Sequence, residues 1–142
     1  MIKDIVEALI HKYGTNCPFT LANLLGINIV YETLGETMGY FTHDFRIKFI
    51  HLNQQLNDKD SIYTCSHELG HAILHPNVNT PFLKRYTLFS TAKIERQANT
   101  FAVELLLPDK VIEESGENSL FVLANRFGIP QRLAELKTVK KF

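Results

Sequence analysis

The stretch Ser66–His75 constrains this chain more than any other, because it contains His67-Glu68-x-x-His71 within a helical pattern. Residues four apart lie one above the other on a helix, so both imidazoles can point at one ion at about 2.0–2.1 Å each. Glu68 lies about 100° further round the helix, too far to be an easy third ligand but well placed to hold a water molecule on that ion. The pattern predicts a zinc-binding helix with Glu68 as its general base.

The chemistry that this pattern predicts is hydrolysis of a peptide bond. Zinc lowers the pKa of a bound water to about 7 and polarises a carbonyl group. Glu68 would take the proton from the attacking water and pass it to the leaving amine. Because the same pattern also occurs by chance on surface helices, the rest of the segment has to support the prediction.

The segment has an apolar side that can pack on a hydrophobic core and a histidine side that can face a metal site. Gly70 leaves room for another backbone to approach closely, and Pro76 ends the helix. The apolar residues that fall opposite the histidines are Ile62, Cys65, Leu69, Ala72 and Ile73.

A catalytic zinc needs a third protein ligand. His75 continues the i, i+4 series, but eight residues of helix rise about 12 Å, so His67 and His75 cannot share one ion. His75 is expected at the helix end, near the last carbonyls or at the rim of the cleft. The best source of a ligand is a second predicted helix over Lys93–Pro108, with Glu95 near its start and Asn99 one turn later.

Glu95 and Asn99 fit a ligand carboxylate followed by an amide that orients a zinc histidine. The alternative is that Glu95 is an ordinary first-turn glutamate, favoured there by the helix dipole. The long segment Asn77–Ser90 is expected to form a wall of the cleft. Within it, Tyr86 is a candidate for stabilising the oxyanion, although a packed loop tyrosine is the simpler interpretation, and His75 is a second candidate for a contact with substrate.

Three stretches in combination are much more specific than the histidine motif alone: Ser66–His75, Glu95–Ala102 and Leu105–Pro108. Together they resemble the ImmA/IrrE family of zinc metallopeptidases. The resemblance extends upstream to Leu21–Ile27 and covers roughly positions 17–130.

The resemblance implies that His67, His71 and Glu95 are the metal ligands and that Glu68 is the base. It also implies a role in phage, mobile-element or stress regulation. In that role, such proteins relieve repression by cleaving a helix-turn-helix repressor.

The composition sets outer limits on function. The chain has 142 residues, 45% hydrophobic and 21% charged, so one domain over 1–142 is expected, with helices at about 119–139 as its extension. Lysine plus arginine equals aspartate plus glutamate at 15 each, which argues against direct binding of nucleic acid. Cys17 and Cys65 are too few for a disulfide framework, and no stretch approaches the roughly 20 apolar residues of a membrane span, so the cytoplasm is the expected location.

The expected fold is α+β and zincin-like, with a small, mainly antiparallel three-stranded sheet packed against helices that include the His67–His71 helix. Strands are predicted at 27–32, 38–42 and 47–52, the last two joined by the tight connection His43–Arg46. Helices are also predicted at 2–13, 17–25, just after Pro108, at 119–127 and at 130–139.

The resulting hypothesis is a zinc-dependent endopeptidase of narrow specificity that cleaves a cytoplasmic repressor. The alternative is an antirepressor that displaces the repressor without cutting it, which neutral charge and a pre-formed cleft fit equally well. A host-directed protease is a third hypothesis, indicated only by the association with mobile elements.

Overall fold

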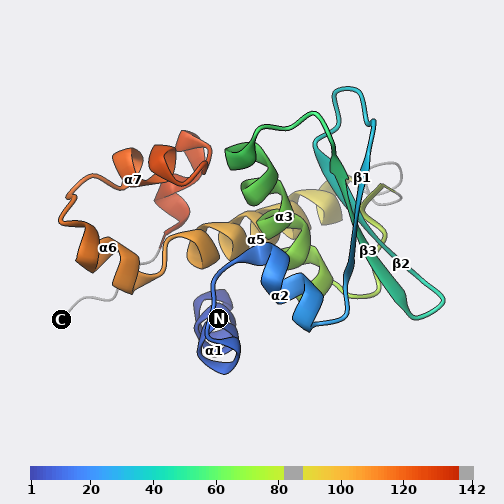
Figure 1. Cartoon of the computed structure of the whole chain (residues 1–142), viewed down its shortest axis with the longest axis horizontal. Coiled ribbons are helices and arrows are strands. Elements are labelled where there is room, and N and C mark those ends of the chain that lie inside the picture. The colour runs from blue at the N-terminus through green and yellow to red at the C-terminus, as the bar shows by residue number, and fades with distance from the viewer. Residues whose placement is uncertain (82–87, 138–142) are drawn as a thin grey trace.

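The computed structural model of the chain describes residues 1–81 and 88–137, and of residues 88–91 it describes the backbone alone. Its helices are α1 (Ile2–Tyr13), α2 (Pro18–Leu24), α3 (Asp58–Leu74), α5 (Leu88–Leu106), α6 (Asp109–Ser115), α7 (Leu120–Arg126) and the 3₁₀ helix η1 (Gln131–Leu136). Its strands are β1 (Asn28–Glu32), β2 (Gly39–Asp44) and β3 (Ile47–Asn53). The helices α3 and α5 run through the middle of the molecule, with the sheet at one end and α6, α7 and η1 at the other (Figure 1).

The sheet has the order β1-β3-β2, with β2 antiparallel and β1 parallel to β3. The prediction of a mainly antiparallel sheet is therefore wrong, since one pairing of each kind is present. Phe45 and Arg46, both with positive φ, form the two-residue turn of the β2–β3 hairpin, which makes these strands neighbours. β3 carries the buried residues Ile50 and Leu52 and is the central strand of the sheet. β1 therefore pairs with β3 and not with β2.

The helix α3 ends where the sequence predicts, directly before Pro76. Asn57 caps its first turn, with Oδ1 accepting a hydrogen bond of 2.8 Å from the amide of Asp60. Its C-cap residue is His75, directly before Pro76. A Cβ added at Gly70 would lie 3.0 Å from Cβ of Phe101, so another element does approach closely at Gly70, but the approaching group is a side chain of α5 and not the backbone expected.

The helix α5 is longer than expected and separates two hydrophobic clusters. It begins at Leu88 rather than at Lys93, because no glycine or proline interrupts the intervening residues, so Glu95 lies in its interior and not near its start. The first cluster joins α5 to α3, the sheet and the N-terminal helices through residues such as Leu21, Phe41, Ile50, Leu69 and Phe101. The second joins α5 to α7 and η1 through Val103, Leu107, Leu123 and Leu133.

The C-terminal part differs from its prediction in one element. The expected helix over 130–139 is the 3₁₀ helix η1, which ends at Leu136, before an extended backbone at Lys137. Part of the expected loop over Asn77–Ser90 is also helical, at Thr80, Pro81 and the first residues of α5. No helix in the described ranges has the length and apolar character needed to cross a membrane.

Candidate metal centre

Two histidines of α3 and one glutamate of α5 converge. Nε2 of His67 lies 2.9 Å from Oε2 of Glu95, and Nε2 of His71 lies 2.9 Å from Oε1 of the same carboxylate. One ligand atom from each of the three side chains lies within 4.8 Å of the other two. The contact of Gly70 with Phe101 brings the two helices close enough for this arrangement.

The donor set fits a divalent metal ion, and the burial of His71 provides a test of that fit. Although Nε2 of His71 is near Glu95, it makes no hydrogen bond of acceptable geometry within the described part of the chain, and it is shielded from solvent. A buried imidazole nitrogen without a partner costs free energy, which coordination of an ion would offset. Two imidazoles and one carboxylate are also a ligand set that zinc accepts in proteins.

Electrostatics keep the carboxylate of Glu95 charged. Burial raises the pKa of Glu95, but the hydrogen bond from His67 and the charges of His67 and His71 lower it more, and the net pKa is far below the ordinary value. Burial lowers the pKa of His67, but the hydrogen bond that His67 donates to Glu95 and the charge of Glu68 outweigh this effect, and the net pKa is raised. For His71 burial prevails and the net pKa is lowered, so its ring favours the neutral form that can bind a metal.

His75 lies against His71 and is in turn held by α5. Nδ1 of His75 is 3.2 Å from Nδ1 of His71, and Nε2 of His75 is 2.7 Å from Oε1 of Gln97. Because an amide oxygen only accepts, Nε2 of His75 carries the hydrogen, and its Nδ1 accepts from the N–H of His71. This chain of hydrogen bonds leaves the lone pair of His71 on Nε2, the atom that faces Glu95.

Asn99 lies beside His67 and lines the same cleft. Its Oδ1 accepts a hydrogen bond of 3.0 Å from the hydroxyl of Tyr63. Nδ1 of His67 is buried and has no partner among the described residues, so the amide does not reach that ring nitrogen in this arrangement. Burial holds the pKa of Tyr63 well above its usual value, so its hydroxyl stays a hydrogen-bond donor.

His67 and Glu95 line a cleft of about 590 Å³ together with Glu68 and Asn99, whereas His71 is fully buried and is not among its lining residues. Glu68 is 4% exposed, so its carboxylate is buried at this cleft. The other lining residues come from the segment that leads into β2, from α3 and from η1: Glu36, Thr37, Met38, Gly39, Tyr63, Thr64 and Arg132. The cleft thus places an open space beside the imidazole of His67 and the carboxylates of Glu68 and Glu95.

Three residues at the site escaped the sequence reasoning: Gly39, Gln97 and Arg132. A glycine within a strand pattern is a signal of close approach, and a Cβ added at Gly39 would lie 2.6 Å from the carbonyl oxygen of His51. Gln97 and Arg132 carry no local signal, because only the packing of α5 and η1 brings them to α3. Tyr86, the expected oxyanion contact, lies outside the described residues.

Comparison with known proteins agrees with this arrangement. The family model of the IrrE N-terminal-like domain, peptidase M78, matches residues 22–137. Immunity region protein 2 of Bacillus phage phi105 is 47% identical over 144 residues, which cover 99% of this chain and 91% of that protein. Metallopeptidase ImmA of Bacillus subtilis (strain 168) is 34% identical over 116 residues, which cover 80% of this chain and 68% of ImmA.

A solved structure shares the fold. A transcriptional regulator of Mycobacterium tuberculosis superposes with a TM-score of 0.62 at 15% identity, and the match covers 95% of this chain but 45% of the regulator. At that identity the likeness concerns the fold alone. The resemblance inferred from the three sequence stretches is confirmed by the family match, and the chain belongs to the IrrE N-terminal-like family, peptidase M78.

Proposed function

We propose that the chain is a zinc-dependent endopeptidase in which His67, His71 and Glu95 hold the metal ion and Glu68 is the general base. The observation that carries the proposal is the convergence of the two Nε2 atoms on one carboxylate, 2.9 Å from each, beside an open cleft. The family match and the similarity to metallopeptidase ImmA support peptidase activity of this kind.

A bound zinc ion would supply the Lewis acid for a peptide carbonyl and make a water molecule easier to deprotonate. Glu68 would take the proton from that water at its carboxylate and deliver it to the nitrogen of the leaving amine. Its burial at the cleft keeps this carboxylate away from bulk solvent while leaving it in contact with the space that a substrate would occupy.

Other residues act through the ligands. His75, held by Gln97, would keep the ring of His71 in the tautomer that presents Nε2 to the ion. Asn99, held by the hydroxyl of Tyr63, would limit the movement of the adjacent His67.

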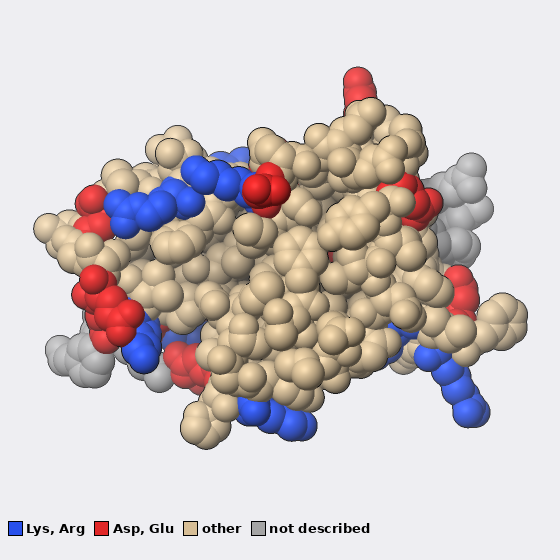
Figure 2. Space-filling view, in the orientation of Figure 1, with Lys and Arg blue, Asp and Glu red and all other residues tan. Residues whose placement is uncertain are grey.

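The proposed substrate is a helix-turn-helix repressor encoded near the gene for this chain. The support is the similarity to an immunity region protein of a phage and to metallopeptidase ImmA. On the face shown in Figure 2, charged side chains lie mostly around the outline and the middle is uncharged, and the total charge of the chain is zero. Such a surface favours a protein partner over a polyanion.

The test combines metal analysis with cleavage of the candidate repressor by the purified protein. We expect about one zinc per chain, cleavage by the wild-type protein, and a Glu68→Gln variant that keeps the metal and loses cleavage. Glu113→Gln, at an exposed position on α6, is the matched control and should cleave normally.

Cleavage retained by Glu68→Gln would overturn the assignment of the base. A repressor that is released from DNA but recovered intact would indicate the non-cleaving antirepressor instead.

A further inference from the structure

The strand nearest the cleft is β2, which forms one edge of the sheet. In an antiparallel pair, alternate residues direct their N–H and C=O groups away from the partner strand. In β2 these residues are Phe41 and His43, because their amides bond to side chains beyond the edge, those of Thr80 and Asn79. The outer edge of β2 therefore faces the segment that follows α3.

This segment covers the outer edge as a neighbouring strand would. The hydroxyl of Thr80 accepts a hydrogen bond of 2.9 Å from the amide of Phe41 and donates one of 3.3 Å to its carbonyl oxygen. Oδ1 of Asn79 accepts a hydrogen bond of 2.6 Å from the amide of His43. Thr80 is 3% exposed, so its hydroxyl is a buried part of this contact. A peptide cannot add to β2 at these two positions while the two side chains are bound there.

Gly39 lies two residues before Phe41 and presents its N–H and C=O to the same edge. Within the described part of the chain, Asn79 and Thr80 bond to His43 and Phe41, and neither bonds to Gly39. Gly39 also lines the cleft that contains His67, Glu68 and Glu95. It is therefore the position of β2 at which an extended peptide can pair next to the metal centre.

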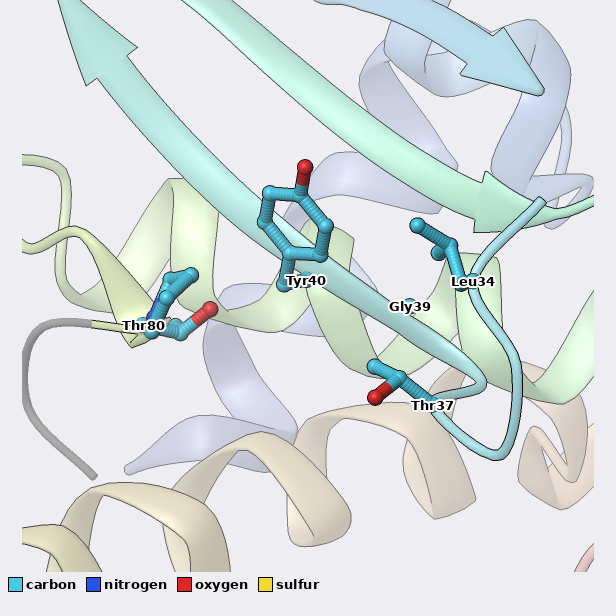
Figure 3. Close-up of a pocket in the computed structure, with 6 residues that line it drawn as sticks. Leu34, Thr37, Gly39, Tyr40 and Thr80 are labelled. Carbon is cyan, nitrogen blue, oxygen red and sulfur yellow. The ribbon is translucent and has the colours of Figure 1, made fainter. Parts of the chain in front are cut away.

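A second pocket begins at Gly39. It has a volume of about 520 Å³ and is lined by Leu34, Thr37, Gly39, Tyr40, Thr80 and Pro81. Figure 3 shows Leu34 and Thr37 on one side of Gly39, with Tyr40 and Thr80 on the other. None of the lining residues that the structure describes is charged, and the pocket shares Thr37 and Gly39 with the cleft.

We infer that this second pocket is a specificity subsite that takes one uncharged, apolar side chain of a peptide substrate paired with β2 at Gly39 alone. Successive side chains of an extended peptide point to opposite sides. When one residue of the bound peptide beside Gly39 has its side chain toward the metal centre, the next residue of the peptide therefore has its side chain toward the pocket. Asn79 and Thr80 prevent the peptide from pairing with β2 beyond Gly39, so few backbone hydrogen bonds form. The choice of substrate therefore depends on the side chain that enters the pocket. The inference rests on the proposed peptidase function.

The first test is a cleavage profile on a pool of randomised octapeptides, with products sequenced by mass spectrometry. We expect the wild-type protein to prefer an apolar residue at one fixed position relative to the cut bond. Leu34→Glu places a charge in the pocket and should lower kcat/KM for those peptides by about tenfold or more and raise the share of lysine and arginine at that position. Leu24→Glu, at a residue 51% exposed on α2, is the control and should keep the wild-type profile.

The second test measures binding without turnover and separates the subsite from the proposed activity. Immobilised Glu68→Gln protein should retain peptides with an apolar residue at one position, and the Leu34→Glu/Glu68→Gln variant should not. If the Glu68→Gln protein retains these peptides but the wild-type protein cleaves none, the peptidase proposal is overturned and the peptide-binding subsite is supported. Cleavage with a profile that Leu34→Glu leaves unchanged would overturn the subsite and keep the peptidase.

The third test concerns the end of pairing at Gly39. Glycine residues added to a cleaved peptide on the side that runs toward Phe41 offer backbone groups and no side chains. We expect them to leave kcat/KM unchanged in the wild-type protein, because Thr80 and Asn79 occupy the edge. A rise of about tenfold, equivalent to roughly 1.4 kcal/mol of added binding, would overturn the inference.

Discussion

The nitrogen Nζ of Lys137 lies 2.6 Å from Oε1 of Glu104, and the two side chains are 1% and 2% exposed. Lys137 also lies 2.9 Å from Oδ1 of Asp109, to which Lys3 bonds at 2.8 Å. The network joins α1, α5, the start of α6 and the residue after η1. It fixes the last described residue of the chain onto the helix that carries Glu95.

We expect Lys137→Met to lower the free energy of unfolding by about 3–5 kcal/mol, because it removes a cation from a buried carboxylate. Urea unfolding followed by circular dichroism measures the change. Lys110→Met is the control: Lys110 is 82% exposed and 3.9 Å from Glu114, so its loss should cost less than about 1 kcal/mol. The double variant Lys137→Met/Glu104→Gln should recover part of the loss, and a double variant no more stable than Lys137→Met would contradict this account.

Asp109 should make the free energy of unfolding depend on pH in the acidic range. Burial raises the pKa of Asp109, but the hydrogen bonds and charges of Lys3 and Lys137 lower it more, and the net pKa is below the ordinary value. Its ionised form therefore stabilises the folded state at a pH above about 3.9, the pKa in the unfolded chain, and this stabilisation disappears as the pH falls through the lower folded value. Asp109→Asn should be less stable than wild type at pH 7, with a difference that shrinks below about pH 4. A difference that stays constant from pH 7 to pH 2 in urea titrations would refute the prediction.

His75 should affect metal binding without touching the ion. His75→Ala removes the acceptor that fixes the tautomer of His71, and we expect the affinity for zinc to fall by about 10–100-fold. Competition with a chromophoric chelator measures the affinity directly. His11→Ala, at an exposed residue of α1, should leave it unchanged. Equal affinities for wild type and His75→Ala would show that the His75–His71 hydrogen bond does not orient the ligand.

Thr80 should stabilise the edge of β2. Thr80→Val keeps the shape of the side chain but leaves the amide and carbonyl of Phe41 without their partner, which should cost about 1–3 kcal/mol of unfolding free energy. Amide hydrogen exchange at Phe41 should become faster in the variant. Thr100→Val is the control, because the hydroxyl of Thr100 bonds to Arg96 within its own exposed turn. Unchanged protection of the Phe41 amide would contradict the role given to Thr80.

Several elements could be predicted closely because their signals are local. The helix α1 has the predicted bounds, and Gly14 follows it in the left-handed conformation that favours glycine. The start of α3 follows from the amide cap of Asn57, and its end follows from Pro76. The spacing of His67 and His71 predicted both rings on one side of that helix, and the pattern of the second helix made Glu95 a candidate ligand, whose carboxylate lies 2.9 Å from each ring.

Other features depended on contacts between segments far apart in the chain. The sequence contains the β2–β3 turn, but no local pattern states that β1 pairs with β3, a choice made by the burial of Ile50 and Leu52 at the centre of the sheet. Likewise, the 3₁₀ form of η1 arises where its residues pack on α5.

The sequence by itself determined which side chains share a helix face, where α1 begins and ends, where α3 ends, and the family to which the chain belongs. Only the tertiary structure decided that Gln97 would hold His75, that Arg132 would reach the cleft, and that Thr80 would cover the edge of β2 beyond Gly39. The reason is physical: helix periodicity and capping act within a few residues, whereas these contacts exist only after burial of the two hydrophobic clusters brings α3, α5 and the sheet together.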